Sequence, residues 1–157
     1  MAKQLNNATA SIKGIIYQFL VALKKCFELQ EKESVYIETF GDVSVFGEET
    51  EQIEAKFYKD DLTDMDSNVW NTLNNWLDDN FDLESFKSLV LLTTQKIKPK
   101  SSWYGWNEKT TAAKLLTLEE IRIEYSKKKK KSEDTQNLLN SVFDNSKKEK
   151  LKLVVGK

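Results

Sequence analysis

The chain has 157 residues, of which 39% are hydrophobic and 11% aromatic, and its formal net charge is −1. This length fits one domain, and the apolar content is sufficient for a buried core. The absence of histidine and the single cysteine, Cys26, exclude Ser-His-Asp and Cys-His catalysis, HExxH zinc sites and an internal disulfide. Hydrolytic chemistry would have to rest on carboxylates, lysine and a hard cation such as magnesium.

The sequence shows neither a membrane span nor a secretory signal. No apolar run reaches the roughly 18 residues that a span needs, and residues 1–14 lack the apolar stretch of a signal peptide. We therefore expect a cytoplasmic protein with no membrane partner.

Charge is divided unevenly along the chain. Residues 1–86 carry 7 Lys or Arg and 17 Asp or Glu, whereas residues 87–157 carry 17 and 8. An acidic half beside a basic half suits a metal site next to a polyanion-binding surface. It suits equally well two halves that attract each other.

The first half of the chain is predicted to hold one helix and three strands. Apolar residues recur at three- and four-residue spacing over 8–31, which predicts a helix with one apolar face. Alternating segments at 34–40, 42–46 and 51–58 predict strands, the last two joined by a turn at 47–50. The apolar face of the helix is predicted to consist of Ile12, Ile16, Phe19, Leu20, Leu23 and Phe27, and Cys26 beside it is expected to be an inert packed thiol.

The next elements are a helix and an interior strand. Asp66 or Ser67 can cap a helix over 68–79, whose apolar face includes Trp70 and Trp76. The continuous apolar run in 87–95 is typical of an interior strand.

The end of the chain is predicted to be mostly helical. A loop at 99–107 precedes helices over about 108–125 and 133–145, which flank five consecutive lysines at 127–131. The final KLKLVVG is expected to begin a strand. A chain that ends there suggests either one domain over 1–157 cut from the N-terminal part of a longer protein or a natural C-terminal strand.

This order predicts the α/β class. The first three strands follow one another through short connections and should form an antiparallel meander, while the fourth follows a helix and can return to the sheet by a crossover. We therefore expect a mixed β-sheet flanked by helices.

The hydrophobic pattern also predicts the register of the hairpin at 42–58. A single core-facing side requires Val43 opposite Ile53, which places Asp42 opposite Glu54. Directly opposed residues have Cβ atoms about 4.5–5.5 Å apart. Two carboxylates this close repel each other unless a cation lies between them or one is protonated.

A magnesium ion bound by Asp42 and Glu54 fits this spacing. Lys56 lies on the same strand face and could orient a water molecule or stabilise charge on a phosphate. Gln52 shares that face and either contacts the site or only solvent. The alternative interpretation of the whole face is a weak surface ion pair.

The residues Asp42 and Glu54-Ala55-Lys56 resemble the signature of the PD-(D/E)xK nuclease superfamily, in which an Asp at the start of one strand precedes (D/E)-x-K on the next. The α-β-β-β-α-β order matches the core of that family. The resemblance implies a restriction-endonuclease-like fold. The Pro of the family signature is replaced here by Gly41.

A closer resemblance spans roughly residues 12–95. GIIYQ (14–18), ETFGDV (38–43), EQIEAKFY (51–58) and LTDMDSNVWNTLNNWL (62–77) are similar to segments of the double-stranded-DNA endonuclease domains at the N-terminus of bacterial anti-phage effectors. In those proteins the nuclease is fused to a sensor or NTPase module. The resemblance implies a Mg²⁺- or Mn²⁺-dependent endodeoxyribonuclease that acts on double-stranded DNA, with such a module as partner, and a homo-oligomer.

The resemblance also implies roles for individual residues. Asp42 and Glu54 would bind the metal with the carbonyl of Ala55, and Lys56 would act on the water or the phosphate. The supporting residues near the site would be Gln18, Glu38 and Gln52.

Basic and aromatic residues elsewhere have two interpretations each. Trp103 lies in a loop beside Lys98 and Lys100, and could stack on DNA bases or anchor the loop to the core. The lysines at 127–131 could bind phosphates or form a solvated linker.

Two other functions stay open. A nuclease-fold module without catalysis would serve DNA binding or oligomerisation, and a purely structural interaction domain would need neither metal nor nucleic acid. The intact Asp42, Glu54 and Lys56 set favours the nuclease.

Overall fold

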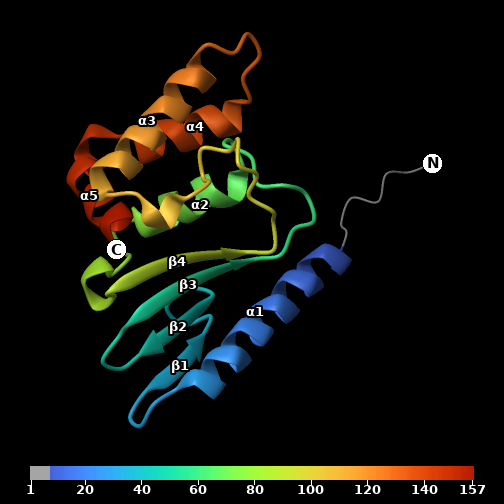
Figure 1. The fold of residues 1–157 in the computed structure, drawn as a ribbon, viewed down its shortest axis with the longest axis vertical. Coiled ribbons are helices and arrows are strands. Elements are labelled where there is room, and N and C mark those ends of the chain that lie inside the picture. Colours follow the sequence, from blue (N-terminus) through green and yellow to red (C-terminus); the bar gives the residue numbers. More distant parts are fainter. Residues whose placement is uncertain (1–7) are drawn as a thin grey trace. The chain divides into compact units, whose positions relative to one another are not determined.

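The structure, a computed structural model, describes residues 8–157 (Figure 1). The chain divides into two compact units. The first contains the described residues up to Lys59 together with Ser85–Thr94, and the second contains Asp60–Glu84 and Gln95–Lys157. No helix in the described part of the chain is long and apolar enough to cross a membrane.

The first unit is a mixed four-stranded sheet with one long helix. The strands lie in the order β1-β2-β3-β4, in which β1, β2 and β3 are antiparallel neighbours and β3 pairs with β4 in parallel. This confirms the predicted meander and crossover, and the α/β class. The elements are α1 (Ala8–Glu28), β1 (Ser34–Ile37), β2 (Val43–Phe46), β3 (Glu51–Lys56) and β4 (Ser88–Thr93).

The predicted hairpin register is confirmed. Val43 pairs with Ile53 and Ser44 with Gln52 across β2 and β3. A shift by one residue would have moved the apolar side chains to the opposite face of the sheet. The hydrophobic pattern alone therefore selects the pairing that brings Asp42 towards Glu54.

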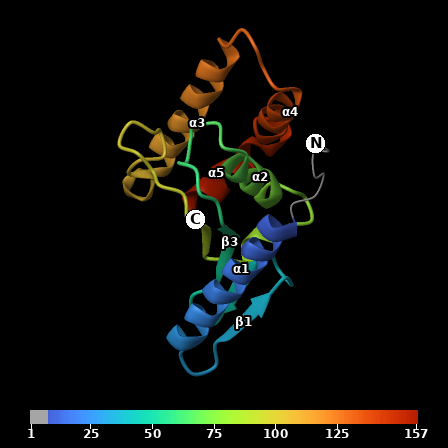
Figure 2. The same cartoon turned by 90° about the vertical axis from the view of Figure 1, so that its right-hand side faces the viewer.

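Helix α1 covers one face of this sheet (Figures 1 and 2). Val21 and Ala22 pack against Val43, Ile53 and Ala55, and all five are buried. Tyr17 of α1 is partly buried against the same cluster.

The predicted core face of α1 is wrong. The large apolar residues expected to face the core are all more than half exposed, and the exposed Cys26 is not the packed thiol expected. Helix α1 is apolar on two sides, and the periodicity identified the more continuous one. The exposed residues of this stripe are Ile12, Ile15, Ile16, Phe19, Leu20, Leu23 and Phe27.

The second unit is helical. Asp66 caps α2 by accepting a hydrogen bond from the Asn68 amide, and Trp70 and Trp76 are buried as predicted. The regular elements are α2 (Ser67–Trp76), α3 (Thr111–Ser126), α4 (Glu133–Val142) and α5 (Lys148–Gly156), with short 3₁₀ turns η1 (Leu83–Ser85), η2 (Trp106–Glu108) and η3 (Asn145–Lys147).

The C-terminal strand expected from KLKLVVG is wrong, because this segment belongs to α5. Leu151, Val154 and Val155 are buried at helical spacing. In so short a segment the same letters also alternate with period two, and the local pattern cannot separate the two.

The charge asymmetry along the sequence does not carry over to the two units. Among the residues that the structure describes, the first unit contains 7 Lys and 9 Asp or Glu, and the second contains 16 Lys or Arg and 16 Asp or Glu. Each unit is close to neutral, so neither one is a polyanion-binding body by net charge. Local clusters have to carry any such role.

The β1–β2 connection depends on Gly41. Its φ is +107°, and a Cβ there would lie 2.1 Å from Nε2 of Gln52. We expect Gly41→Ala to destabilise the fold by about 1–3 kcal/mol, measured by denaturant unfolding.

Gly14→Ala is the matched control. Gly14 lies inside α1 with no atom within 4 Å of an added Cβ, so the change should stabilise by about 0.5–1 kcal/mol. Equal effects at both positions would contradict this account.

Candidate active site

Three charged side chains meet where β2 begins and β3 ends. Nζ of Lys56 lies 2.7 Å from Oε2 of Glu54 and 3.0 Å from Oδ2 of Asp42. The Ala55 amide donates to the same Oδ2 at 2.8 Å, which fixes the Asp42 carboxylate at the end of the hairpin. The predicted pair of carboxylates is therefore assembled, and an ammonium group lies between them.

This cluster is buried, unlike an ordinary solvated strand face. The side chains of Glu54, Asp42 and Lys56 are 8%, 15% and 22% exposed, and Gln52 is fully buried. An exposed ion pair contributes little to stability, whereas charges at this depth need defined partners. The partial burial and the shared ammonium favour a defined cluster over a weak surface ion pair.

The ammonium of Lys56 is held in its charged form. Burial acts to lower the pKa of Lys56, but the hydrogen bonds and charges of Glu54 and then Asp42 outweigh it and raise the pKa above the ordinary value of 10.5. In this state Lys56 is a cation and a hydrogen-bond donor, and it has no free electron pair with which to act as a base.

Gln52 contacts the site and not solvent. Its Nε2 donates to Oε1 of Glu54 at 3.1 Å, so both oxygens of this carboxylate have donors. Gly41 lies directly against the Gln52 amide. A side chain at Gly41 would push Gln52 away from Glu54, and the turn is thereby linked to the orientation of the carboxylate.

The oxygen atoms left for a cation come from Asp42 and Ala55, and the Glu54 carboxylate would join them on losing its contact with Lys56. Oδ1 of Asp42 accepts no hydrogen bond from the residues that the structure describes. Residues of a strand direct their backbone groups alternately to the two neighbouring strands. The Ala55 amide points to Asp42 and the Lys56 carbonyl accepts from Thr94, so the Ala55 carbonyl is directed to the side of Asp42. Carboxylate and carbonyl oxygens are what Mg²⁺ prefers.

Two carboxylates are all that the described residues bring to this point, because no group of three or more His, Cys, Asp or Glu gathers anywhere in residues 8–157. Magnesium sites commonly use one or two carboxylates and complete their coordination with water and substrate phosphate. The donor set fits such a site and does not fit an all-protein cage.

The other two residues predicted to support the site are Glu38 and Gln18, and their positions differ from that of Gln52. Glu38 has an exposed side chain and a positive φ of 55°, and its amide donates to the Asp42 carbonyl at 3.2 Å. It therefore shapes the turn through its backbone. Gln18 is half-buried on α1, and no hydrogen bond between it and either carboxylate is found among the described residues.

Trp103 is part of the core of the second unit. It is 5% exposed, packs edge-on against Trp70 and Trp106, and donates to the Thr63 carbonyl at 2.9 Å. This matches the anchoring interpretation of the loop, because a buried ring offers no face to a base. Lys98 and Lys100 are exposed, and Lys98 is paired with Asp61.

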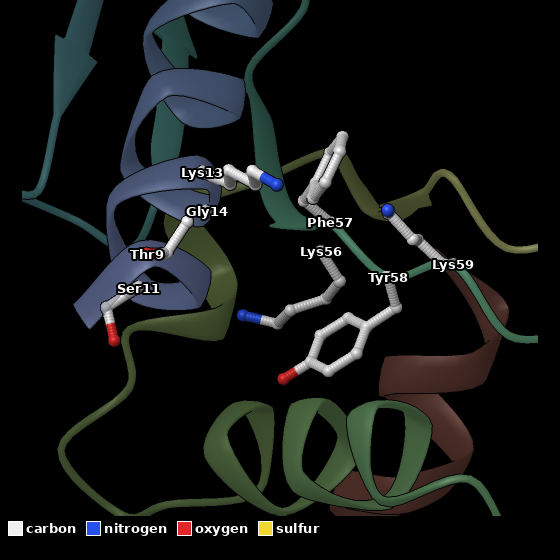
Figure 3. Close-up of a pocket in the computed structure, with 8 residues that line it drawn as sticks. All are labelled: Thr9, Ser11, Lys13, Gly14, Lys56, Phe57, Tyr58 and Lys59. Carbon is white, nitrogen blue, oxygen red and sulfur yellow. The ribbon is translucent and has the colours of Figure 1, made fainter. Parts of the chain in front are cut away.

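A pocket of about 490 Å³ opens beside Lys56. Figure 3 shows its lining, in which the start of α1 lies near the chain that leaves β3. The sequence had not indicated two of its lysines, Lys13 and Lys59. Their positions in the sequence could have indicated them, because Lys13 precedes Gly14 of the GIIYQ segment and Lys59 follows Lys56 by three residues. The pocket is lined by Thr9, Ser11, Lys13, Gly14, Lys56, Phe57, Tyr58 and Lys59.

No model of a known protein family matches the chain, and neither does a curated protein or a solved structure. The functional argument therefore depends on the geometry around Asp42, Glu54 and Lys56.

Removing the ammonium tests the electrostatics of this cluster. We expect Lys56→Met to destabilise the fold by about 2–4 kcal/mol near neutral pH, because it leaves two buried carboxylates without a cation. The deficit should shrink above pH 10.5, because the raised pKa of Lys56 makes its contribution to stability full below the unfolded value and lost as the pH rises through the folded one.

The matched control is Asp42→Asn/Lys56→Met, in which the carboxylate repulsion is absent. Urea unfolding at several pH values should show this variant to be more stable than Lys56→Met at neutral pH. A double variant that is less stable than the single one would show that Lys56 acts by packing and not by charge.

Proposed function

We propose that this protein is a metal-dependent endodeoxyribonuclease. The observation that carries the proposal is the convergence of Asp42, Glu54 and Lys56 within 3.0 Å contacts at the end of one hairpin. Without histidine, two carboxylates and a lysine are the residue types left for phosphodiester hydrolysis assisted by a hard cation.

The carboxylates of Asp42 and Glu54 and the carbonyl of Ala55 would hold Mg²⁺ or Mn²⁺. When bound, the divalent ion would supply Lewis-acid stabilisation of the phosphate and a more acidic water molecule. The protein contributes two negative charges already held close together, so little rearrangement is needed to receive a cation.

Lys56 would serve the phosphate. Its ammonium is charged and lines the pocket, and a fixed cation there stabilises the negative charge that develops on a phosphate oxygen during hydrolysis. A divalent ion shared by the carboxylates would compete with Lys56 for them and leave its N–H groups free for the substrate.

The pocket beside Lys56 suits a DNA backbone. Three of its eight lining residues are lysines, Lys13, Lys56 and Lys59, and lysines attract phosphates without reading sequence. Tyr58 is half exposed at the same place and offers an aromatic face and a hydroxyl group. We propose that one strand of double-stranded DNA enters the site along this side.

The resemblance of this site to PD-(D/E)xK nucleases supports the same activity. It extends the proposal to a restriction-endonuclease-like fold and to the effector part of an anti-phage protein with a sensor or NTPase module as partner. One departure from the signature has a physical reason: Gly41 stands where the family has Pro, and its φ of +107° is one that proline cannot adopt.

A second candidate is a nuclease-fold module without catalysis. The resting cluster favours it in one respect, because the ammonium of Lys56 already satisfies both carboxylates. Such a module would bind DNA and cleave none with any divalent ion. Cleavage assays on plasmid DNA separate the two candidates.

We expect plasmid cleavage that requires Mg²⁺ or Mn²⁺ and stops with chelator. Asp42→Asn, Glu54→Gln and Lys56→Met should each reduce the rate by about 100-fold or more, because each removes a group that holds the cation or stabilises the transition state.

Two variants with the same chemical changes outside the cluster are the controls. Glu48→Gln lies in the β2–β3 turn and Lys87→Met beside β4, and both side chains are exposed. They should cleave like the parent. If folded Asp42→Asn protein cuts as fast as the parent, the assignment of this site is wrong.

The pocket lysines should control DNA affinity. Lys13→Ala and Lys59→Ala are each expected to weaken DNA binding for all sequences alike and to reduce the slope of log K against log salt by about one, as for the loss of one phosphate contact. Lys87→Ala, an exposed lysine outside the pocket and outside α1, is the control. Fluorescence anisotropy with a catalytically inactive parent measures all three, and an unchanged slope in the pocket variants would contradict this binding mode.

A further inference from the structure

The outer face of α1 is apolar without a partner among the described residues. Seven large apolar side chains project from it, and each is between 51% and 83% exposed. They span the helix from Ile12 to Phe27. Burial of this face cannot come from the sheet, because the opposite side of α1 already packs there through Val21 and Ala22.

The size of this stripe matches an interface. Seven half-exposed side chains at about 90–100 Å² each present roughly 600–700 Å² of apolar surface, above the ~300–600 Å² of the largest patch on a typical monomer. A standard protein interface takes about 800 Å² from each partner. The stripe nearly reaches that value before any rim residue is added.

The order of residues in the stripe is self-complementary. In an antiparallel pair of α1 helices, facing residues have numbers with a constant sum. A sum of 39 places Ile12 opposite Phe27, Ile16 opposite Leu23, and Phe19 opposite Leu20. The one register therefore pairs six of the seven exposed residues with one another, which is the requirement of a two-fold interface.

The rim is compatible with this pairing. In the same register Lys13 of one copy lies at the level of the Lys24–Glu28 pair of the other, since these residues share one edge of the stripe. The Glu28 carboxylate, which lies 3.7 Å from Lys24 in its own copy, would offset part of the repulsion between Lys13 and Lys24. The opposite edge contains the uncharged Ser11 and Cys26.

We propose that α1 forms an antiparallel two-fold dimer with α1 of a second copy of this chain, through the stripe from Ile12 to Phe27. A membrane surface suits this helix less well. Its polar residues would have to face solvent opposite the stripe, and that side is packed on the sheet. The dimer needs neither metal nor DNA and does not depend on the proposed nuclease activity.

Sedimentation of the full chain tests the dimer. The mass should rise with concentration from 18.2 kDa to twice that value. Leu23→Glu should raise the dimer dissociation constant at least about tenfold, since the charge is buried twice in a symmetric interface. Leu116→Glu is the matched control, because Leu116 is an equally exposed apolar residue outside α1, and it should dimerise like the parent.

Cysteine cross-linking tests the direction and register. The two Cys26 residues of an antiparallel pair lie about 20 Å apart along the helices, so the parent should not cross-link, whereas a parallel pair would bring them together. In a Cys26→Ser background, Phe19→Cys lies next to the two-fold axis and should cross-link to itself. Ile16→Cys should not do so alone, but should when mixed with Leu23→Cys.

Several results would overturn the proposal. These are a monomer at all concentrations, a dimer that Leu23→Glu does not weaken, or efficient Cys26 cross-linking. Binding of the monomer to vesicles of phosphatidylcholine and phosphatidylglycerol through the same stripe would replace the second copy by a lipid surface. Circular dichroism of each variant confirms that lost association is not lost folding.

Discussion

The ammonium of Lys56 between the carboxylates of Asp42 and Glu54 is the interaction on which the first unit depends. Two carboxylates held this close and this deep repel each other strongly unless a cation accompanies them. The surrounding structure holds them there nevertheless. The β2–β3 register aligns the two strands, the Ala55 amide fixes Asp42, and the buried Gln52 fixes Glu54. Stability and candidate function therefore draw on the same five-residue arrangement, with Lys56 as a removable counter-ion.

Helix α1 covers the sheet with only a small part of its apolar surface. Helix α1 packs on the sheet through the buried Val21 and Ala22 and the partly buried Tyr17. Its bulky residues, including Phe19 and Phe27, point the other way. One helix thus serves two surfaces. Its first turns line the pocket beside Lys56, and its outer stripe offers a place for a second copy. The pocket and the stripe meet at Lys13, which lines the pocket and lies at the edge of the stripe.

Prediction from the sequence succeeded where a periodic pattern was compatible with only one structure. The alternation in 42–58 fixed the strand pairing, and with it the meeting of Asp42 and Glu54, because the alternative register exposes the apolar face. Prediction from the sequence failed where one pattern was compatible with two structures. The letters KLKLVV fit a strand and a helix, and α1 carries two apolar sides. The role of Lys56 as the resident cation, and the contact between Gln52 and Gly41, required coordinates, because both depend on which side chain fills a shared space.

The residues of the candidate site lie within fifteen positions of the chain, and this has a consequence for synthesis. A hairpin forms in about 1–10 μs, whereas a ribosome adds about 5–20 residues per second. Some two to six seconds therefore pass between the appearance of β3 and that of β4. During this time the far edge of β3 has no partner, and an open strand edge invites pairing with another chain. Glu51, Glu54 and Lys56 give this strand a charged side chain on each face. The nascent hairpin carries its own counter-ion and its own protection against aggregation until β4 arrives.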